Sequence, residues 1–85
     1  MENRVAVMSI IVENSDIVES LNSILHDYGS YVIGRMGIPY RARDINIISI
    51  ALDAPQNVIS TLSGKIGQLE GISVKTAFSG VISND

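Results

Sequence analysis

The fold is decided by the stretch at residues 4–28, RVAVMSIIVENSDIVESLNSILHDY, in which the apolar residues change their spacing. Residues 4–13 form an apolar run with the length of a β-strand. The Asn-Ser-Asp sequence at 14–16 then offers side-chain oxygens that cap a helix N-terminus. Gly29 follows in the C′ position, where many helices end. Between these signals lies one helical stripe of apolar residues, namely Ile17, Val18, Leu21, Ile24, Leu25 and Tyr28.

The same alternation of strand and helix continues through the rest of the chain. The expected elements are a strand at about 30–37, a loop at 38–44, a strand at 45–52, a helix opened by Asp53 and Pro55 and ended by Gly71, and a strand at 72–79. Proline suits the first turn of a helix. The stripe of this second helix consists of Val58, Ile59, Leu62, Ile66 and Leu69.

The predicted order of elements is therefore β-α-β-β-α-β. Its simplest packing is a ferredoxin-like α+β sandwich, in which a four-stranded antiparallel sheet carries both helices on one face. Right-handed crossovers place the first and third strands in the middle of the sheet. We expect one domain over residues 1–85.

Composition excludes several classes of function. The chain has 85 residues, no cysteine and a formal net charge of −3. Disulfides, thiolate metal sites and cysteine nucleophiles are therefore excluded. The acidic balance argues against direct nucleic-acid binding by the isolated domain. The longest uncharged apolar runs are far shorter than the ~20 residues of a membrane span, and the N-terminal sequence lacks the layout of a secretory signal. We expect a cytoplasmic protein that does not enter the membrane.

Strand parity predicts which side chains face the helices. The inward set comprises Ala6, Met8, Ile10, Val12, Ile48, Ile50, Leu52, Ile72, Val74 and Phe78. The opposite face carries Val5, Val7, Ser9, Ile11, Ile47, Ser49 and Ala51 on the two central strands, with Arg35 and Lys75 expected at its flanks. An apolar centre with a polar rim is typical of an interaction surface. This face is therefore our candidate oligomer interface; the alternative is a weakly polar, solvated face.

The segment at 29–44, GSYVIGRMGIPYRARD, contains three of the six basic residues of the chain. Guanidinium groups suit carboxylates and phosphates because their donors match two oxygens. Glycine permits the close approach of a ligand. The candidate ligand or anion site therefore consists of Arg35, Gly37, Tyr40, Arg41 and Arg43. The alternative is a solvated hairpin tip.

Catalytic and metal-binding chemistry finds little support. The Ser63–Gly67 segment lacks the full phosphate-loop pattern and falls within a helix. His26 is the single histidine, and alone it cannot build a transition-metal site. No nucleophile–base pair or close carboxylate pair stands out. We expect no enzyme activity, no cofactor and no metal.

Two stretches, ILHDYGSYVIGRMGIPYRARDINIISIAL at 24–52 and TLSGKIGQLEGISVKTAFS at 61–79, resemble the family of iron-only hydrogenase system regulators. The resemblance extends over about residues 4–79. It implies a small stand-alone ACT-like protein with a ferredoxin-like fold and a regulatory role. ACT domains bind small effectors at subunit interfaces. The turn Glu13–Asp16 lacks the glycine common in ACT domains that bind amino acids.

These observations predict a non-enzymatic, ligand-sensing regulatory module of the iron-only hydrogenase system. The expected partners are further copies of the chain, which form a homo-oligomer, and a small anionic effector. The alternative function is a protein-interaction or assembly module without a small-molecule ligand.

Overall fold

The computed structural model describes residues 2–83. Its strands are β1 (Asn3–Val12), β2 (Val32–Tyr40), β3 (Ile45–Pro55) and β4 (Ile72–Ser83), and its α-helices are α1 (Val18–Asp27) and α2 (Gln56–Gly67). Short 3-10 helices precede α1 at Ser15–Ile17, precede β2 at Gly29–Tyr31 and join β2 to β3 at Arg41–Arg43. The predicted order of elements is confirmed.

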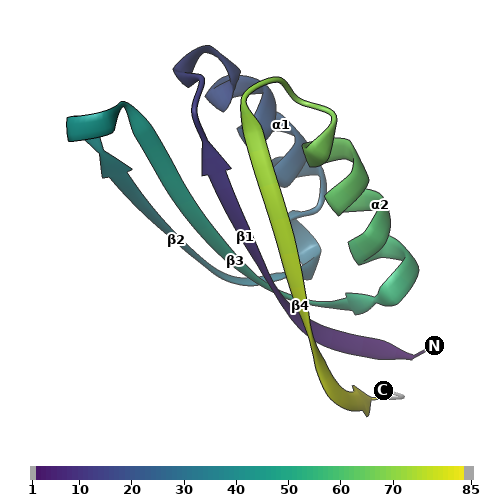
Figure 1. The fold of residues 1–85 in the computed structure, drawn as a ribbon. Coiled ribbons are helices and arrows are strands. Elements are labelled where there is room, and N and C mark those ends of the chain that lie inside the picture. The colour runs from purple at the N-terminus through teal and green to yellow at the C-terminus, as the bar shows by residue number, and fades with distance from the viewer. Residues whose placement is uncertain (1, 84–85) are drawn as a thin grey trace.

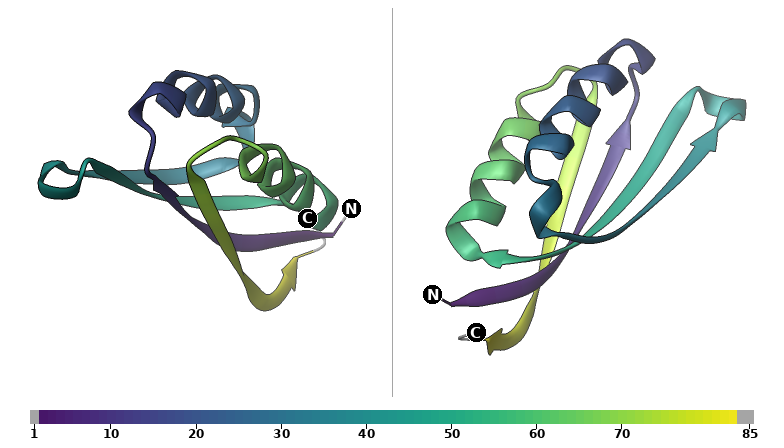
Figure 2. Two further views of the ribbon diagram at one scale, coloured as in Figure 1. Left: turned by 45° about the horizontal axis from the view of Figure 1, so that its top comes forward. Right: turned by 180° about the vertical axis from the view of Figure 1, so that it is seen from behind.

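All neighbouring strands are antiparallel, in the order β2-β3-β1-β4. Both helices cover one face of this sheet, and the other face is open (Figures 1 and 2). The ferredoxin-like α+β fold and the central position of the first and third strands are therefore confirmed. The molecule is elongated, with extents of 42 × 19 × 17 Å, because the hairpin of β2 and β3 continues beyond the helices (Figure 2).

The core lies between the sheet and the two helices, where the sequence predicted it. Leu21 and Leu25 are the buried residues of α1, and α2 buries Ile59, Leu62 and Ile66. The sheet contributes a matching layer of side chains that are at most 5% exposed: Ala6, Met8, Ile10, Val12, Ile48, Ile50, Leu52 and Ala54. Helices of 10 and 12 residues are marginal alone, so burial of these stripes stabilises them.

The residues that follow β1 contact the residue that precedes β4. Gly71 has a φ of +72°, and a Cβ atom built on it would lie 2.7 Å from the Cβ of Asn14. Its carbonyl oxygen accepts a hydrogen bond of 2.7 Å from the backbone N–H of Glu13. Asn14 in turn caps the following turn, where its side-chain oxygen accepts from the N–H of Asp16. Glycine is therefore required at position 71.

The strands are longer than predicted at three places. β3 continues through Asp53 to Pro55, because its pairing with β1 extends to Asn3. Pro55 consequently occupies the N-cap of α2 rather than its first turn. β2 continues through residues 38–40 of the expected loop at 38–44, and β4 extends to Ser83.

Phe78 corrects part of the predicted core. It pairs with the buried Ala6 and so lies on the helix side of the sheet, as predicted. It nevertheless remains 38% exposed, because β4 is an edge strand whose outer side has no further strand. It borders a hollow beside Ser63 and Gly64 of α2, two residues too small to cover an aromatic ring.

Candidate functional site

The prediction that Arg35 flanks the open sheet face is wrong. A regular continuation of the pair Val32–Leu52 would place Arg35 opposite Ser49 on the open face. The register instead shifts between Val32 and Gly34, and Arg35 pairs with the buried Ile50. A shift of one residue moves every following side chain to the opposite face. Arg35 therefore extends from the helix side of β2.

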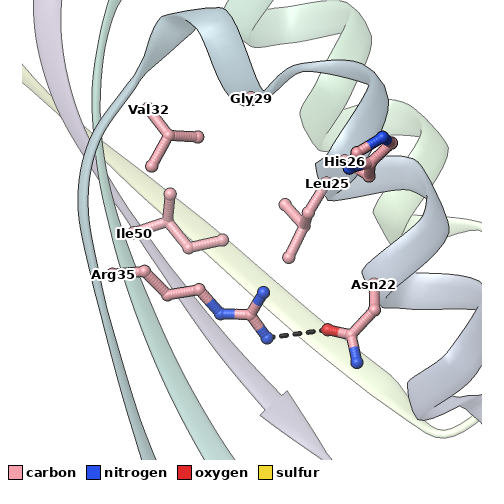
Figure 3. Close-up of a pocket in the computed structure, with 7 residues that line it drawn as sticks. All are labelled: Asn22, Leu25, His26, Gly29, Val32, Arg35 and Ile50. Atoms are coloured by element: carbon pink, nitrogen blue, oxygen red, sulfur yellow. Dashed lines mark hydrogen bonds between the residues drawn. The ribbon is translucent and has the colours of Figure 1, made fainter.

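Two adjoining hollows, which share Arg35 in their lining, form a groove between α1 and β2, an edge strand of the sheet. We call it the α1–β2 groove. One half is a pocket of about 350 Å³ lined by Asn22, Leu25, His26, Gly29, Val32, Arg35 and Ile50. Figure 3 shows Leu25, Val32 and Ile50 pointing into the space between helix and sheet. This half thus combines an apolar floor with polar groups at its rim.

The other half of the groove lies towards the hairpin tip. It is a hollow of about 230 Å³ lined by Val18, Arg35, Gly37, Ile38, Pro39, Asn46, Ile47 and Ile48. Arg35 lines both halves and therefore stands between them. No aspartate or glutamate contributes to either lining. Arg35 gives the groove a permanent positive charge in a protein whose net charge is −3.

The Arg35 side chain crosses the groove from β2 to α1. Its Nη2 donates a hydrogen bond of 2.7 Å to the Oδ1 of Asn22 (Figure 3). A guanidinium has five N–H donors in a planar fork. Asn22 offers one neutral amide oxygen, whereas a carboxylate would offer two charged ones. Both residues are exposed, so a ligand can reach the guanidinium.

The structure does not bring the five predicted ligand residues into one place. Arg35 and Gly37 line the groove. Tyr40 lies on the open face, and Arg41 and Arg43 form the 3-10 turn at the hairpin tip. Asp44, with a φ of 53°, completes this turn by donating its N–H to the carbonyl of Arg41. The five residues therefore do not form one site: two line the groove, and two form the turn at the hairpin tip. Their roles in binding stay predictions.

The seven predicted interface residues lie together on the open face. Ser9 and Ser49 pair at its centre, Ile11 pairs with Ile47, and Val7 pairs with Ala51. Val5 extends the same face of β1 beyond Val7. Their role in association stays a prediction.

The alternation of side chains along the sequence did not predict that β2 contributes apolar side chains to the open face. Met36 pairs with Ser49, Ile38 pairs with Ile47, and Tyr40 follows on the same side. All three side chains are exposed. Their position depends on the same register shift that moves Arg35, so only a recognised bulge at Gly34 could have indicated it. Lys75 does lie on this face, opposite Ser9.

Metal ligands do not gather in the part of the chain that the structure describes. No group of three or more histidine, aspartate or glutamate residues within 2–83 is arranged to hold an ion. His26 is exposed at the rim of the α1–β2 groove. No described helix is long and apolar enough to cross a bilayer.

The fold and the groove define a class: a small ferredoxin-like α+β protein with an open sheet face and an arginine-bridged groove. A family model described as "TM1266-like: Iron-only hydrogenase system regulator, putative" matches residues 4–76. The chain belongs to this family of iron-only hydrogenase system regulators. The predicted resemblance is therefore confirmed.

Solved structures agree with this assignment. The protein TM1266 from Thermotoga maritima is 31% identical, with a TM-score of 0.86 over 89% of this chain and 96% of that one. Two more distant structures share the fold alone. A formyltetrahydrofolate deformylase from Pseudomonas putida KT2440 has 10% identity and a TM-score of 0.62 over 86% of this chain and 28% of its own. The PII-like protein CPII from Thiomonas intermedia K12 has 13% identity and a TM-score of 0.50 over 94% and 99%. No curated protein sequence matches the chain.

Proposed function

We propose that the protein is a non-enzymatic regulatory module that acts as a homo-oligomer and senses a small anionic effector. Its family is described as a regulator of the iron-only hydrogenase system. The α1–β2 groove supports the sensing role, because it offers an accessible cation beside an apolar floor. The proposal does not require a catalytic group.

The observation that carries the proposal is the apolar character of the open sheet face. Val5, Val7, Ile11 and Ile47 are each 41–44% exposed, although β1 and β3 are the central strands. Met36 and Ile38 of β2 enlarge the patch. These six exposed aliphatic side chains lie on three adjacent strands, and a contiguous apolar patch of this kind marks an interaction surface.

A second copy of the chain fits this face better than an added strand fits the β2 edge of the sheet. Ser9 and Ser49 are small residues at the centre of the face, so another sheet can approach closely there. Pro39 and the bulge between Val32 and Gly34 interrupt β2 as an edge for further pairing. Face-to-face packing would cover the exposed aliphatic side chains of β1, β2 and β3 together.

The hairpin tip gives this association a second point of contact. The 3-10 turn at Arg41–Arg43, which joins β2 to β3, lies beyond the helices of its own subunit (Figure 2). In an acidic chain, carboxylates of a neighbouring copy are natural partners for Arg41 and Arg43. We assign these two arginines to the contact between subunits, and Arg35 to the effector.

The test is association of the Ile47→Glu variant. Buried at the middle of the face, a glutamate would lose its hydration without a partner charge, so association should weaken strongly. Sedimentation velocity at tens of micromolar measures the oligomer. Ser60→Glu, which adds the same charge on the exposed outer side of α2, should sediment like wild type. A wild-type chain that sediments as a stable monomer would refute the oligomer.

A protein-interaction module without a small ligand is the second candidate. The open face favours it, because that face alone can bind a partner. A ligand that binds the native state raises thermal stability. Stabilisation by small anions therefore supports sensing, and its complete absence supports the interaction module.

A further inference from the structure

We infer that the α1–β2 groove binds a small organic acid, with its carboxylate on Arg35 and its aliphatic body against Leu25 and Val32. This inference rests on the proposed sensing function and names the site and the chemical class of its effector. The site lies within one subunit and does not include the hairpin-tip residues Arg41 and Arg43.

The charge of the groove selects an anion. Arg35 supplies a permanent positive charge, and both halves of the groove are lined without an acidic residue. Within residues 2–83, its guanidinium makes one side-chain hydrogen bond, to the amide oxygen of Asn22. The remaining donors of the fork can therefore meet a carboxylate, which accepts two parallel hydrogen bonds.

The floor of the groove selects an apolar body. Leu25, which is 5% exposed, and the partly buried Val32 line the apolar side of the pocket (Figure 3), and the core residue Ile50, 0% exposed, backs this lining without offering accessible surface. A volume of about 350 Å³ lies at the small end of the ~300–1,000 Å³ typical of ligand pockets. A short branched acid uses both features of the site, whereas inorganic phosphate uses the charge alone.

Asn22 makes the inference testable without removing the arginine. Asn22→Asp should weaken the binding of an acid, because the new carboxylate at the same position would hold the guanidinium as an ion pair and repel an anion. Asn22→Ala should leave the guanidinium free and retain binding. Both substitutions lie on the exposed side of α1, so the fold should tolerate them.

The experiment is a titration of the full chain with isovalerate, followed by ¹H–¹⁵N NMR spectra that include the arginine Nε and asparagine side-chain signals. Isovaleramide is the neutral control of the same shape, and phosphate is the anion without an apolar body. We expect saturable shifts at Arg35, Asn22 and Leu25 with isovalerate, and much weaker binding of both controls. Arg35→Gln should lower the affinity about tenfold or more, as expected for a charge-assisted contact. Arg4→Gln, which removes the same charge outside the groove, should not change it.

Several results would overturn the inference. One such result is that isovaleramide or phosphate binds as tightly as isovalerate. Others are an unchanged affinity for isovalerate in Arg35→Gln, or no chemical-shift change at the groove residues at millimolar isovalerate. Shifts centred on Arg41 and Arg43 would overturn the groove while keeping an anion-sensing function. The oligomer is tested separately by sedimentation, so failure of the site and failure of the proposed assembly are distinguishable.

Discussion

Replacing Gly71 by alanine should destabilise the protein by about 1–5 kcal/mol. The left-handed conformation costs an L-residue roughly 1–2 kcal/mol. The new Cβ would lie 2.7 Å from the Cβ and 3.3 Å from the backbone N of Asn14, and such overpacking typically costs about 1–3 kcal/mol. The lower entropy of the unfolded chain offsets only about 0.4–1 kcal/mol. For a domain whose total stability is of order 4–13 kcal/mol, this is a large share.

Gly64→Ala is the matched control, and its expected sign is opposite. Gly64 lies inside α2, and a Cβ added there would meet no atom within 4 Å. Alanine should therefore stabilise the helix by about 0.8–1 kcal/mol. The two variants make the same chemical change in different backbone conformations and surroundings.

Urea unfolding followed by far-UV circular dichroism measures both effects. The protein concentration must be the same for all variants, because association links stability to concentration. The slope of the transition should not change, and the midpoint should move down for Gly71→Ala and up for Gly64→Ala. A Gly71→Ala midpoint equivalent to less than about 0.5 kcal/mol of destabilisation, the range of ordinary surface substitutions, would refute the reasoning about the contact with Asn14.

Three further predictions concern the core, the hairpin tip and the histidine. Leu62→Ala, at a side chain 1% exposed, should cost about 2–5 kcal/mol in the same unfolding assay; a loss below about 1 kcal/mol would contradict tight packing. Arg41→Gln combined with Arg43→Gln should lower oligomer stability in sedimentation and preserve the circular dichroism spectrum; unchanged association would leave the tip as a solvated turn. Purified protein should release nickel and zinc to a chelator; stoichiometric metal that is retained, and lost in His26→Ala, would contradict this.

The candidate site shows where prediction from the sequence stopped. An arginine cluster in an acidic chain predicts anion binding, and that role stays a prediction. The grouping of these residues could not be predicted, because the strand places Arg35 and Gly37 on the helix side while Arg41 and Arg43 form the tip turn. Asn22 and Leu25 gave no signal as ligand residues. The sequence shows only their helical spacing, and the chain brings α1 beside β2 through tertiary packing.

The sequence by itself determined the order of strands and helices, the buried stripes of α1 and α2, and the inward layer of β1 and β3. These features follow from local periodicity and from burial, which act over a few residues. Only the tertiary structure decided which face receives the Arg35 side chain and the Met36 side chain. One extra residue between Val32 and Gly34 reverses the alternation of β2 relative to β3. That reversal carries Arg35 into the groove and Met36 onto the open face, because side chains alternate strictly along a strand and a bulge changes their count.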